Sequence, residues 1–182
     1  MKYLVISDIH GDIKSLKQAL LIGEQNEVDA VLCLGDILYH GPRNDVPSDY
    51  APKKVMEVLN GMKEKLICVQ GNCDSEVDQM VLNFPILNEV NQFYLGNRKV
   101  LMCHGHVMDD KYFAALKKGD IFIFGHIHVP VLECMEGVYM LNPGSTTIPQ
   151  KDSVKSVGIL DEEHFELIDL FAGQVLDSII FE

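Results

Sequence analysis

The feature that most constrains this chain is a set of five polar clusters, each of which directly follows a short apolar run typical of a buried strand. The clusters read Ser7-Asp8-Ile9-His10-Gly11, Gly35-Asp36, Gly71-Asn72-Cys73-Asp74, His104-Gly105-His106 and Gly125-His126-Ile127-His128. In open α/β sheets, ligands gather beyond the carboxyl ends of strands. We therefore expect these clusters to converge in space although they are far apart in the sequence.

The clusters supply side chains that bind divalent cations. The candidate metal ligands are Asp8, His10, Asp36, Asn72, His104, His126 and His128. Nitrogen and oxygen donors without a thiolate pair suit Mn, Fe, Ni, Zn or Mg and argue against an iron–sulfur cluster. In the D-x-H and H-x-H segments, the alternation of side chains along a strand predicts that each pair faces one side and clasps a metal.

Each cluster taken alone has an ordinary explanation. A Gly-Asp after a strand is also a plain turn, and a lone histidine at a strand end is often a surface residue. The five clusters in this order favour a metal site over these explanations. His164 lies outside the clusters in a late strand, and we expect it at the surface.

The first 125 residues alternate predicted strands (2–7, 30–34 and 66–70) with predicted helices (13–21, 51–62 and 75–82). From residue 93 on, the pattern changes and hairpins become frequent, with predicted strands at 93–95, 99–103, 121–124, 131–134, 138–141, 156–160, 165–170 and 175–181 and a predicted helix at 112–118. Asp12 and Ser75 are the expected N-caps of the helices that follow them. The pattern predicts a mixed α/β (α+β) fold with two mixed sheets packed face to face and flanked by helices.

Composition narrows the class of protein further. A chain of 182 residues without internal repeats or a linker suits one domain, residues 1–182. The net charge of −12 argues against bulk nucleic-acid binding, because like charges repel. The five cysteines form no CxxC pair, which favours a reducing compartment. No apolar run reaches the roughly 18–20 residues of a membrane helix, so we expect a cytoplasmic protein.

The cluster order D-x-H, GD, GN-x-D, H-G-H and GH-x-H resembles the calcineurin-like metallophosphoesterase superfamily, from Lys2 to about Ser145. Within it, Gly71-Asn72-Cys73-Asp74, residues 39–44 and Asn142-Pro143-Gly144-Ser145 are similar to the YfcE-like bacterial phosphodiesterases. The resemblance implies an αββα sandwich. It also implies two divalent cations per chain, Mn first and Ni, Fe, Zn, Mg or Co as alternatives.

By the same resemblance, one cation is held by Asp8, His10, Asp36 and His128, and the second by Asp36, Asn72, His104 and His126. A hydroxide that bridges the two cations would attack a phosphodiester in line with the leaving alcohol, with Asp36, Asn72 and His104 as the catalytic set. The candidate substrate-binding residues are His40, Arg43, Cys73 and His106. For Arg43 the alternatives are a solvated loop charge or a subunit contact, and for His106 a turn histidine. For Cys73 they are a side chain that only fills space or a thiolate nucleophile.

Three functions remain open at this level. The first is a phosphodiesterase with a small-molecule substrate, and the second is a phosphomonoesterase or nucleotide phosphatase. The third is a non-catalytic interaction scaffold on the same fold. Position 73 separates the first two, because many metallophosphoesterases have there a histidine that protonates the leaving group, where this chain has Cys73. Self-association into a homo-oligomer is also expected from the resemblance.

Overall fold

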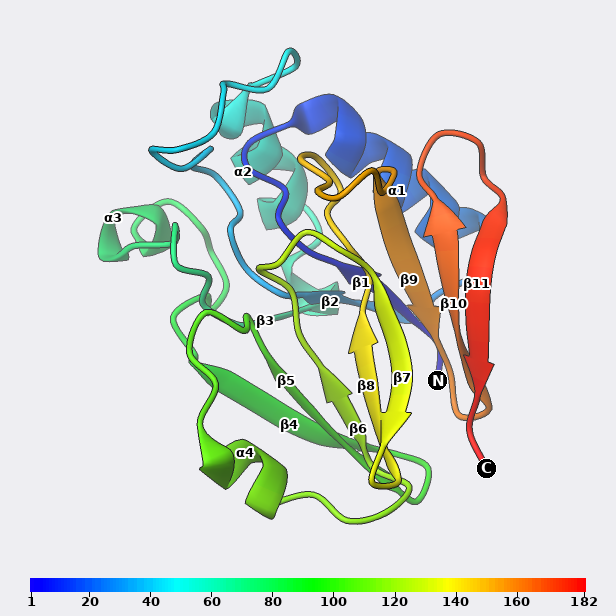
Figure 1. Cartoon of the computed structure of the whole chain (residues 1–182). Helices are drawn as coiled ribbons and strands as arrows, with labels where there is room; N and C mark the ends of the chain where they lie inside the picture. Colours follow the sequence, from blue (N-terminus) through cyan, green and yellow to red (C-terminus); the bar gives the residue numbers. More distant parts are fainter.

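Two mixed β-sheets lie face to face in the computed structural model, which describes residues 1–182 (Figure 1). One sheet has the strand order β11-β10-β9-β1-β2-β3 and the other β4-β5-β6-β8-β7. The six strands of the first sheet are β1 (Tyr3–Ile6), β2 (Ala30–Cys33), β3 (Leu66–Cys68), β9 (Ser156–Leu160), β10 (His164–Asp169) and β11 (Val175–Ile180). The five strands of the second are β4 (Val90–Leu95), β5 (Arg98–Cys103), β6 (Ile121–Ile123), β7 (Val131–Met135) and β8 (Val138–Asn142).

Helices cover the outer faces of both sheets. The long helices α1 (Ile13–Gln25) and α2 (Pro52–Asn60) pack on the six-stranded sheet, and the short helix α4 (Asp110–Ala114) lies outside the five-stranded sheet (Figure 1). A single turn, α3 (Glu76–Gln79), follows β3, and a 3₁₀ turn spans Lys63–Lys65. This arrangement is the αββα sandwich that the sequence predicts. No helix in the structure combines the length and the apolar character needed to cross a membrane.

Strand β1 shows why the sheet sequences read as unbroken apolar runs. Leu4 and Ile6 join the core beneath α1 and α2, whereas Tyr3 and Val5 join the core between the two sheets. Successive side chains of a strand point to opposite faces, so a strand covered on both faces must be apolar throughout. Four residues of β1 thus contribute to two separate cores.

The register of the parallel strands brings their carboxyl ends level. Ile6 of β1 pairs with Cys33 of β2, and Cys33 pairs with Cys68 of β3. In the second sheet, β5, β6 and β8 are also parallel, with Met102 opposite Ile123. The segments that leave these strands therefore emerge along shared edges of the two sheets, and these segments are the polar clusters.

Every predicted strand is present, with ends within three residues of the prediction. Asp12 caps α1 by accepting the amide of Ser15 at 2.9 Å, and Ser75 caps α3 in a reciprocal pair with Asp78. All five cysteines are free, and Cys33, Cys68 and Cys103 are buried.

The predicted helix at 112–118 is wrong in its position. The helix runs from Asp110 to Ala114, because Asp109 caps its first turn through the amide of Lys111. The amide of Lys117, which a longer helix would need, instead donates to the carboxylate of Asp120 at 2.9 Å. A local side-chain acceptor has replaced the helical hydrogen bond.

Candidate metal centre

The five clusters meet at one edge of the sandwich. Asp8 and Asp36 follow β1 and β2 of the six-stranded sheet, whereas His104 and His128 follow β5 and β6 of the five-stranded sheet. All four of these side chains are buried. The centre is therefore built from both sheets.

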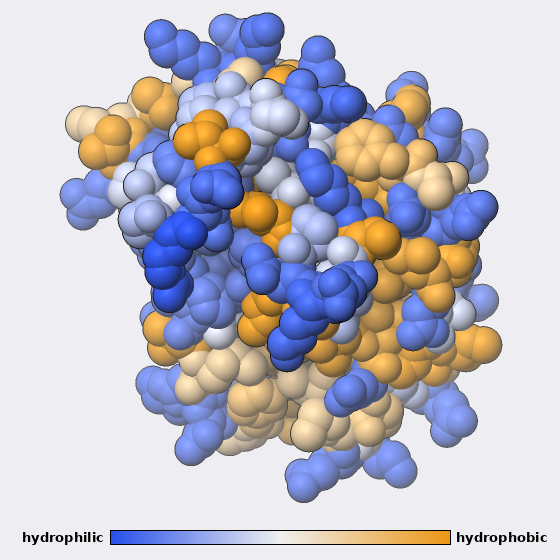
Figure 2. Space-filling model, turned by 45° about the horizontal axis from the view of Figure 1, so that its top comes forward, coloured by the Kyte–Doolittle hydropathy of each residue, from blue (hydrophilic) through white to orange (hydrophobic).

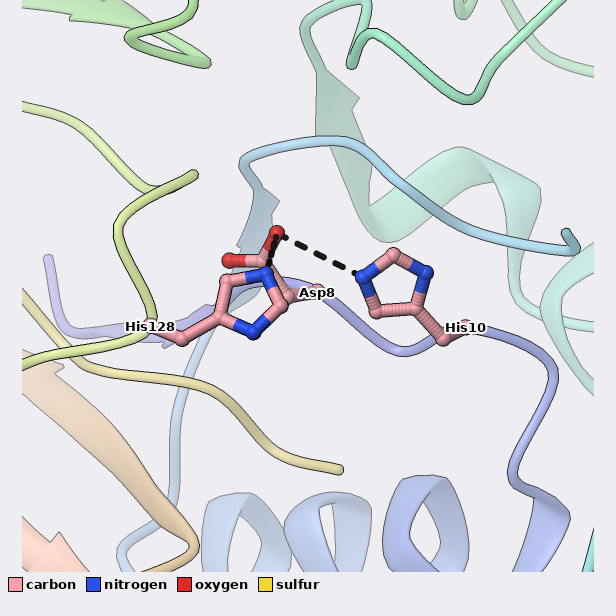
Figure 3. A group of neighbouring side chains, drawn as sticks. All are labelled: Asp8, His10 and His128. Carbon is pink, nitrogen blue, oxygen red and sulfur yellow. Dashed lines mark ion pairs between the residues drawn. The ribbon is translucent and has the colours of Figure 1, made fainter. Parts of the chain in front are cut away.

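Asp8 lies at the middle of one group of donors (Figure 3). Its Oδ1 atom is 3.2 Å from Nε2 of His128 and 3.8 Å from Nε2 of His10, and both imidazoles point toward the carboxylate. Its Oδ2 atom accepts the hydroxyl of Ser7 at 2.6 Å and the amide of His126 at 3.2 Å. One carboxylate oxygen is thus fixed by the protein while the other faces the histidines.

Asp36 lies between this group and a second one. Its Oδ2 atom is 3.6 Å from Nε2 of His10 and 3.5 Å from Nε2 of His104. On the far side of His104, Oδ1 of Asn72 is 3.1 Å from the same Nε2 atom. The ring of His126 lies beside His104, with centroids 5.1 Å apart. Both carboxylates face histidines of the two groups, but Asp36 lies within 3.6 Å of a histidine in each, whereas Asp8 Oδ1 is 3.9 Å from His104 Nε2.

Three of the imidazoles are held in the same tautomer by the backbone. The Nδ1 atoms of His10, His104 and His128 lie 2.8, 2.6 and 2.7 Å from the carbonyl oxygens of Tyr39, Leu34 and Ile148. A carbonyl only accepts, so each Nδ1 carries a proton and donates it. When the ring is neutral, each Nε2 presents its lone pair to the centre, which is the arrangement typical of metal-binding histidines.

Two buried polar atoms at the centre have no hydrogen-bond partner, Asp8 Oδ1 and His10 Nε2. Leaving such an atom unsatisfied costs about 1–3 kcal/mol. Carboxylate, imidazole and amide donors match divalent first-row cations and Mg²⁺. The residues present therefore fit the cation that the sequence predicts, and these unpartnered atoms are the ones a cation would satisfy.

The backbone at these donors is not extended, which corrects one step of the sequence argument. Left-handed φ angles occur at five of the seven predicted ligands, namely 56° at Asp8, 46° at His10, 56° at Asp36, 66° at His126 and 56° at His128. Asp8 and His10 converge through consecutive tight turns, so strand alternation does not apply to them. His126 and His128 do not form a pair: His128 faces Asp8, whereas His126 lies beside His104.

Such backbone conformations cost about 1–3 kcal/mol each for residues other than glycine and persist only where the surroundings enforce them. Three hydroxyls after β8 hold the turn that contains Asp8. Ser145 Oγ donates to the Asp8 carbonyl at 3.1 Å, Thr146 Oγ1 to the Ser7 carbonyl at 3.1 Å and Thr147 Oγ1 to the Ile9 carbonyl at 2.8 Å. Of these supporting residues, Ser145 belongs to the Asn142-Pro143-Gly144-Ser145 segment noted in the sequence, whereas Thr146 and Thr147 were not predicted.

Asp74 supports the turn at Asp36 in the same way. Its carboxylate accepts the amides of Asp36, Ile37 and Gly71, each at 2.8 Å. Burial raises the pKa of Asp74 to about 6, although these three donors favour its charged form. Gly71 is required here, because a Cβ atom at this position would run into the Asp36 carboxylate.

The charges at the centre are strongly coupled. Burial disfavours the charged form of His104, but its hydrogen bond to Asp36 and the negative charge of Asp8 outweigh this and raise its pKa to about 9. Burial likewise disfavours ionised Asp36, yet His104 and the amide of Cys73 lower its pKa to about 2. Without a cation, a proton on His104 Nε2 therefore partly neutralises the carboxylates.

An open cavity of about 360 Å³ lies over the donors. Besides His10, Asp36, Asn72, His126 and His128, its lining includes Arg43, Cys73, Asn44 and Gln150, the last two of which the sequence argument did not single out. His40 does not line it: its ring packs edge-on between Tyr39 and Tyr50, 4.7 and 5.4 Å between centroids. His106 is exposed beside His104 and also lies outside the lining.

Cys73 is half-buried, and its amide donates to Asp36 Oδ1 at 2.7 Å. Burial, followed by the charge of Asp36, raises the pKa of its thiol to about 12. An unperturbed thiol has a pKa of about 8.5. The Cys73 thiol is thus a weaker acid than a free cysteine, and its thiolate is not populated at neutral pH.

The fold and the donors match a known family. The family model of the calcineurin-like phosphoesterase superfamily domain matches residues 1–164. The chain is 41% identical to phosphodiesterase YfcE of Escherichia coli strain K12 over 170 residues, which are 93% of this chain and 92% of that protein. The chain therefore belongs to the calcineurin-like phosphoesterase superfamily.

Solved structures agree with this assignment. The structure of YfcE, a phosphoesterase from E. coli, superposes with a TM-score of 0.95 at 38% identity and covers all of both chains. Vps29 from Entamoeba histolytica, solved in complex with zinc, has a TM-score of 0.65 at 24% identity over the full length of both chains. The second match shows a shared fold alone.

Proposed function

We propose that this chain is a phosphodiesterase that binds two divalent cations and hydrolyses small phosphodiesters. The observation that carries the proposal is the position of Asp36, whose Oδ2 atom is 3.6 Å from His10 Nε2 and 3.5 Å from His104 Nε2. A carboxylate between two groups of nitrogen donors suits a bridging ligand. Family membership and the identity to a protein named phosphodiesterase support the reaction class.

The donors divide into two sets in this proposal. Asp8, His10 and His128, whose ligand atoms lie within 4.8 Å of one another, hold one cation together with Asp36. Asn72, His104 and His126 hold the other together with Asp36. Among the cations that such donors accept, Mn²⁺ is our first candidate, and Ni²⁺, Fe²⁺, Zn²⁺, Mg²⁺ and Co²⁺ are alternatives that availability would decide.

When bound, such cations lower the pKa of a coordinated water and offset charge on phosphate oxygens. The residues of the chain position the metal donors. Asp36 fixes the separation of the two donor sets, and the carbonyls behind His10, His104 and His128 fix the direction of each Nε2 lone pair. Arg43, in the cavity wall, offers a planar fork to the phosphate oxygens.

Cys73 favours diesters over monoesters. General acid catalysis is typically worth about 10²–10⁴-fold, and a thiol with a pKa of about 12 is a far weaker proton donor than an imidazolium. The departing alkoxide must then be stable without a proton, as aryl oxides are. A monoester also brings a further negative charge into a cavity that lies over two carboxylates. We therefore propose aryl diesters as good substrates and monoesters as poor ones.

The alternative of a scaffold without catalysis is not favoured, because all seven predicted donors are present and six of them have a donor atom within 4 Å of another donor. Cytoplasmic location and self-association stay predictions from the sequence. No membrane partner or bulk nucleic acid is part of the proposal.

The substitution Asp36→Asn tests the proposal. After reloading with Mn²⁺, elemental analysis should find about two ions per chain in the unmodified protein and far fewer in the variant. Hydrolysis of an aryl phosphodiester should fall at least about 100-fold in the variant. The matched control is Asp177→Asn, which changes an exposed carboxylate on β11. Full activity in protein freed of metal would refute the proposal.

A further inference from the structure

A second cavity lies directly beside the one over the metal donors. It measures about 390 Å³ and is lined by Leu38, Tyr39, Tyr50, Pro52, Cys73, Ser75, Val77 and Asp78. Cys73 belongs to the walls of both cavities. The two cavities thus adjoin at Cys73, the place where a group attached to a phosphorus over the donors would enter the second cavity.

The wall of the second cavity is tied to the metal donors. The carbonyl of Tyr39 accepts the Nδ1 proton of His10 at 2.8 Å, and the amide of Cys73 donates to Asp36 at 2.7 Å. Tyr39 also packs edge-on against His40, with ring centroids 4.7 Å apart. These contacts fix the orientation of the cavity relative to the reacting centre, as a substrate subsite requires.

The two cavities differ in chemistry. Two of the twelve residues that line the first are hydrophobic, whereas five of the eight that line the second are. No lysine or arginine lines the second cavity and Asp78 adds a carboxylate, so the cavity disfavours a phosphate. Its Ser75 hydroxyl is already bonded to the Asp78 carboxylate at 2.7 Å. What remains for a ligand is carbon surface, including Tyr39 and Val77, which are 41% and 69% exposed.

We propose that this second cavity is the subsite for the leaving alcohol of the diester and that it selects an aromatic alcohol. The proposal rests on the phosphodiesterase function proposed above. Hydrolysis adds one water across the P–O bond and yields a phosphomonoester and the free alcohol, which departs from this cavity. An aromatic ring gains from burial against Val77 and from packing on the ring of Tyr39.

Binding of the leaving group in this subsite is a separate effect from the chemical reactivity of aryl esters. Without a general acid, the enzyme favours any alcohol that is acidic, whether or not it has a ring. The subsite favours the ring itself. Two diesters whose leaving alcohols have matched acidity therefore separate the two effects, such as methyl 4-chlorophenyl phosphate and methyl hexafluoroisopropyl phosphate.

The unmodified protein, loaded with cations, should show a kcat/KM about tenfold higher for the chlorophenyl diester, which corresponds to one aromatic packing interaction with its burial. Tyr39→Ala and Val77→Ala should each lower the ratio of the two kcat/KM values severalfold, mainly through KM. Tyr94→Ala, which removes a 69% exposed tyrosine on β4, is the matched control and should keep the ratio. A ratio that stays at its original value in both cavity variants would overturn the subsite while leaving the phosphodiesterase function intact.

A binding measurement makes the subsite testable apart from turnover. Methyl NMR spectra of protein loaded with diamagnetic Mg²⁺ should show shifts of the Val77 signals on addition of 4-chlorophenol, and weaker shifts in Tyr39→Ala. Unmoved Val77 signals in the unmodified protein would refute the subsite. If neither diester is hydrolysed by the unmodified protein, the proposed function fails, and the NMR titration alone then decides whether the cavity binds aromatic alcohols.

Discussion

The carboxylate of Asp74 accepts the backbone amide of Asp36 at 2.8 Å, across 38 residues of sequence. The same carboxylate accepts the amides of Ile37 and Gly71. It therefore joins the segment that follows β2 to the segment that follows β3. The bridging position proposed for Asp36 depends on this junction, although Asp74 is not itself among the proposed ligands.

Asp74→Asn should weaken the centre without removing a ligand. An amide has one oxygen, and its NH₂ group would face a backbone N–H, so at least one buried donor loses its acceptor. We expect the free energy of unfolding to fall by about 1–3 kcal/mol and the cation affinity to fall about tenfold or more. Urea denaturation and calorimetric titration measure the two effects, with Asp177→Asn as the control. An unchanged unfolding midpoint would contradict the role given to Asp74.

Arg43→Ala should lower kcat/KM for diesters by about 10–100-fold, because a charge-assisted hydrogen bond contributes about 1.5–3 kcal/mol. The metal content should stay at its original value, since Arg43 contacts none of the proposed ligands through a hydrogen bond or ion pair. Arg43→Lys should restore part of the activity, because a point charge replaces a planar fork. Steady-state kinetics with elemental analysis checks this. Unchanged kinetics in the alanine variant would identify Arg43 as a solvated loop charge.

Cys73→Ser and Cys73→His examine the missing general acid. The serine variant should keep most of the activity on aryl diesters, because the thiol, with a pKa of about 12, takes no part as a nucleophile. The histidine variant should gain up to about 10²-fold on diesters with alkyl leaving groups. Rates across a series of leaving alcohols measure the gain. Loss of nearly all activity in the serine variant would favour a nucleophilic cysteine, and a histidine variant that binds its metals and gains nothing would refute the argument.

Cation binding should depend on pH through His104. Its pKa in the cation-free protein is raised to about 9, so below that pH it carries a proton that a cation must displace. The apparent affinity should therefore rise by about tenfold per pH unit between pH 7 and 9 and level off above. Calorimetric titrations in two buffers of different ionisation enthalpy count the released proton. Binding at pH 7 without proton release would contradict the raised pKa.

The same shift affects the stability of the cation-free protein. A histidine whose pKa is higher in the folded state stabilises the fold below its unfolded pKa of about 6.5, and this contribution is lost as the pH rises through 9. Urea unfolding at pH 6 and pH 9.5 gives the difference.

Self-association is expected through the edge of the six-stranded sheet. Strand β11 pairs only with β10, and its Val175, Leu176 and Ile180 are 55%, 45% and 73% exposed. Figure 2 shows hydrophobic side chains gathered on this side of the molecule. Because exposed apolar edge strands readily pair with other chains, Ile180→Lys should shift the protein toward monomer. Light scattering measures this, with Leu21→Lys on α1 as control; a monomer at all concentrations of the unmodified protein would refute the expectation.

The strand pattern of the sequence was sufficient to predict the two sheets and the convergence of the donors. Strands such as β1, which is apolar throughout because both its faces are covered, are recognisable from local composition. The level register of β1, β2 and β3 then brings Asp8, Asp36 and Asn72 to one edge. For these three residues, the apolar strand pattern of the sequence and the topology of the sheet both place the side chains at the same edge.

The backbone geometry of the donors could not be predicted in the same way. The left-handed turns at Asp8 and His10 depend on hydrogen bonds from a distant segment, such as those that Ser145 and Thr147 donate to the carbonyls of Asp8 and Ile9, and no local pattern records them. The prediction of a helix at 112–118 was wrong because the side chains of Asp109 and Asp120 accept backbone amides at the two ends of this segment. His40 was placed near the substrate from its position in the sequence, yet its ring packs between two tyrosines.

The left-handed backbone at Asp8, His10, Asp36, His126 and His128 also bears on how such a protein can change over evolutionary time. A residue that replaces one of these donors must still adopt a left-handed backbone conformation. Glycine and asparagine adopt it at the lowest conformational cost. Drift away from catalysis should therefore pass first through glycine or asparagine at these five positions. β-Branched replacements would break the turn itself, so a descendant that abandoned the reaction but kept the fold should avoid them.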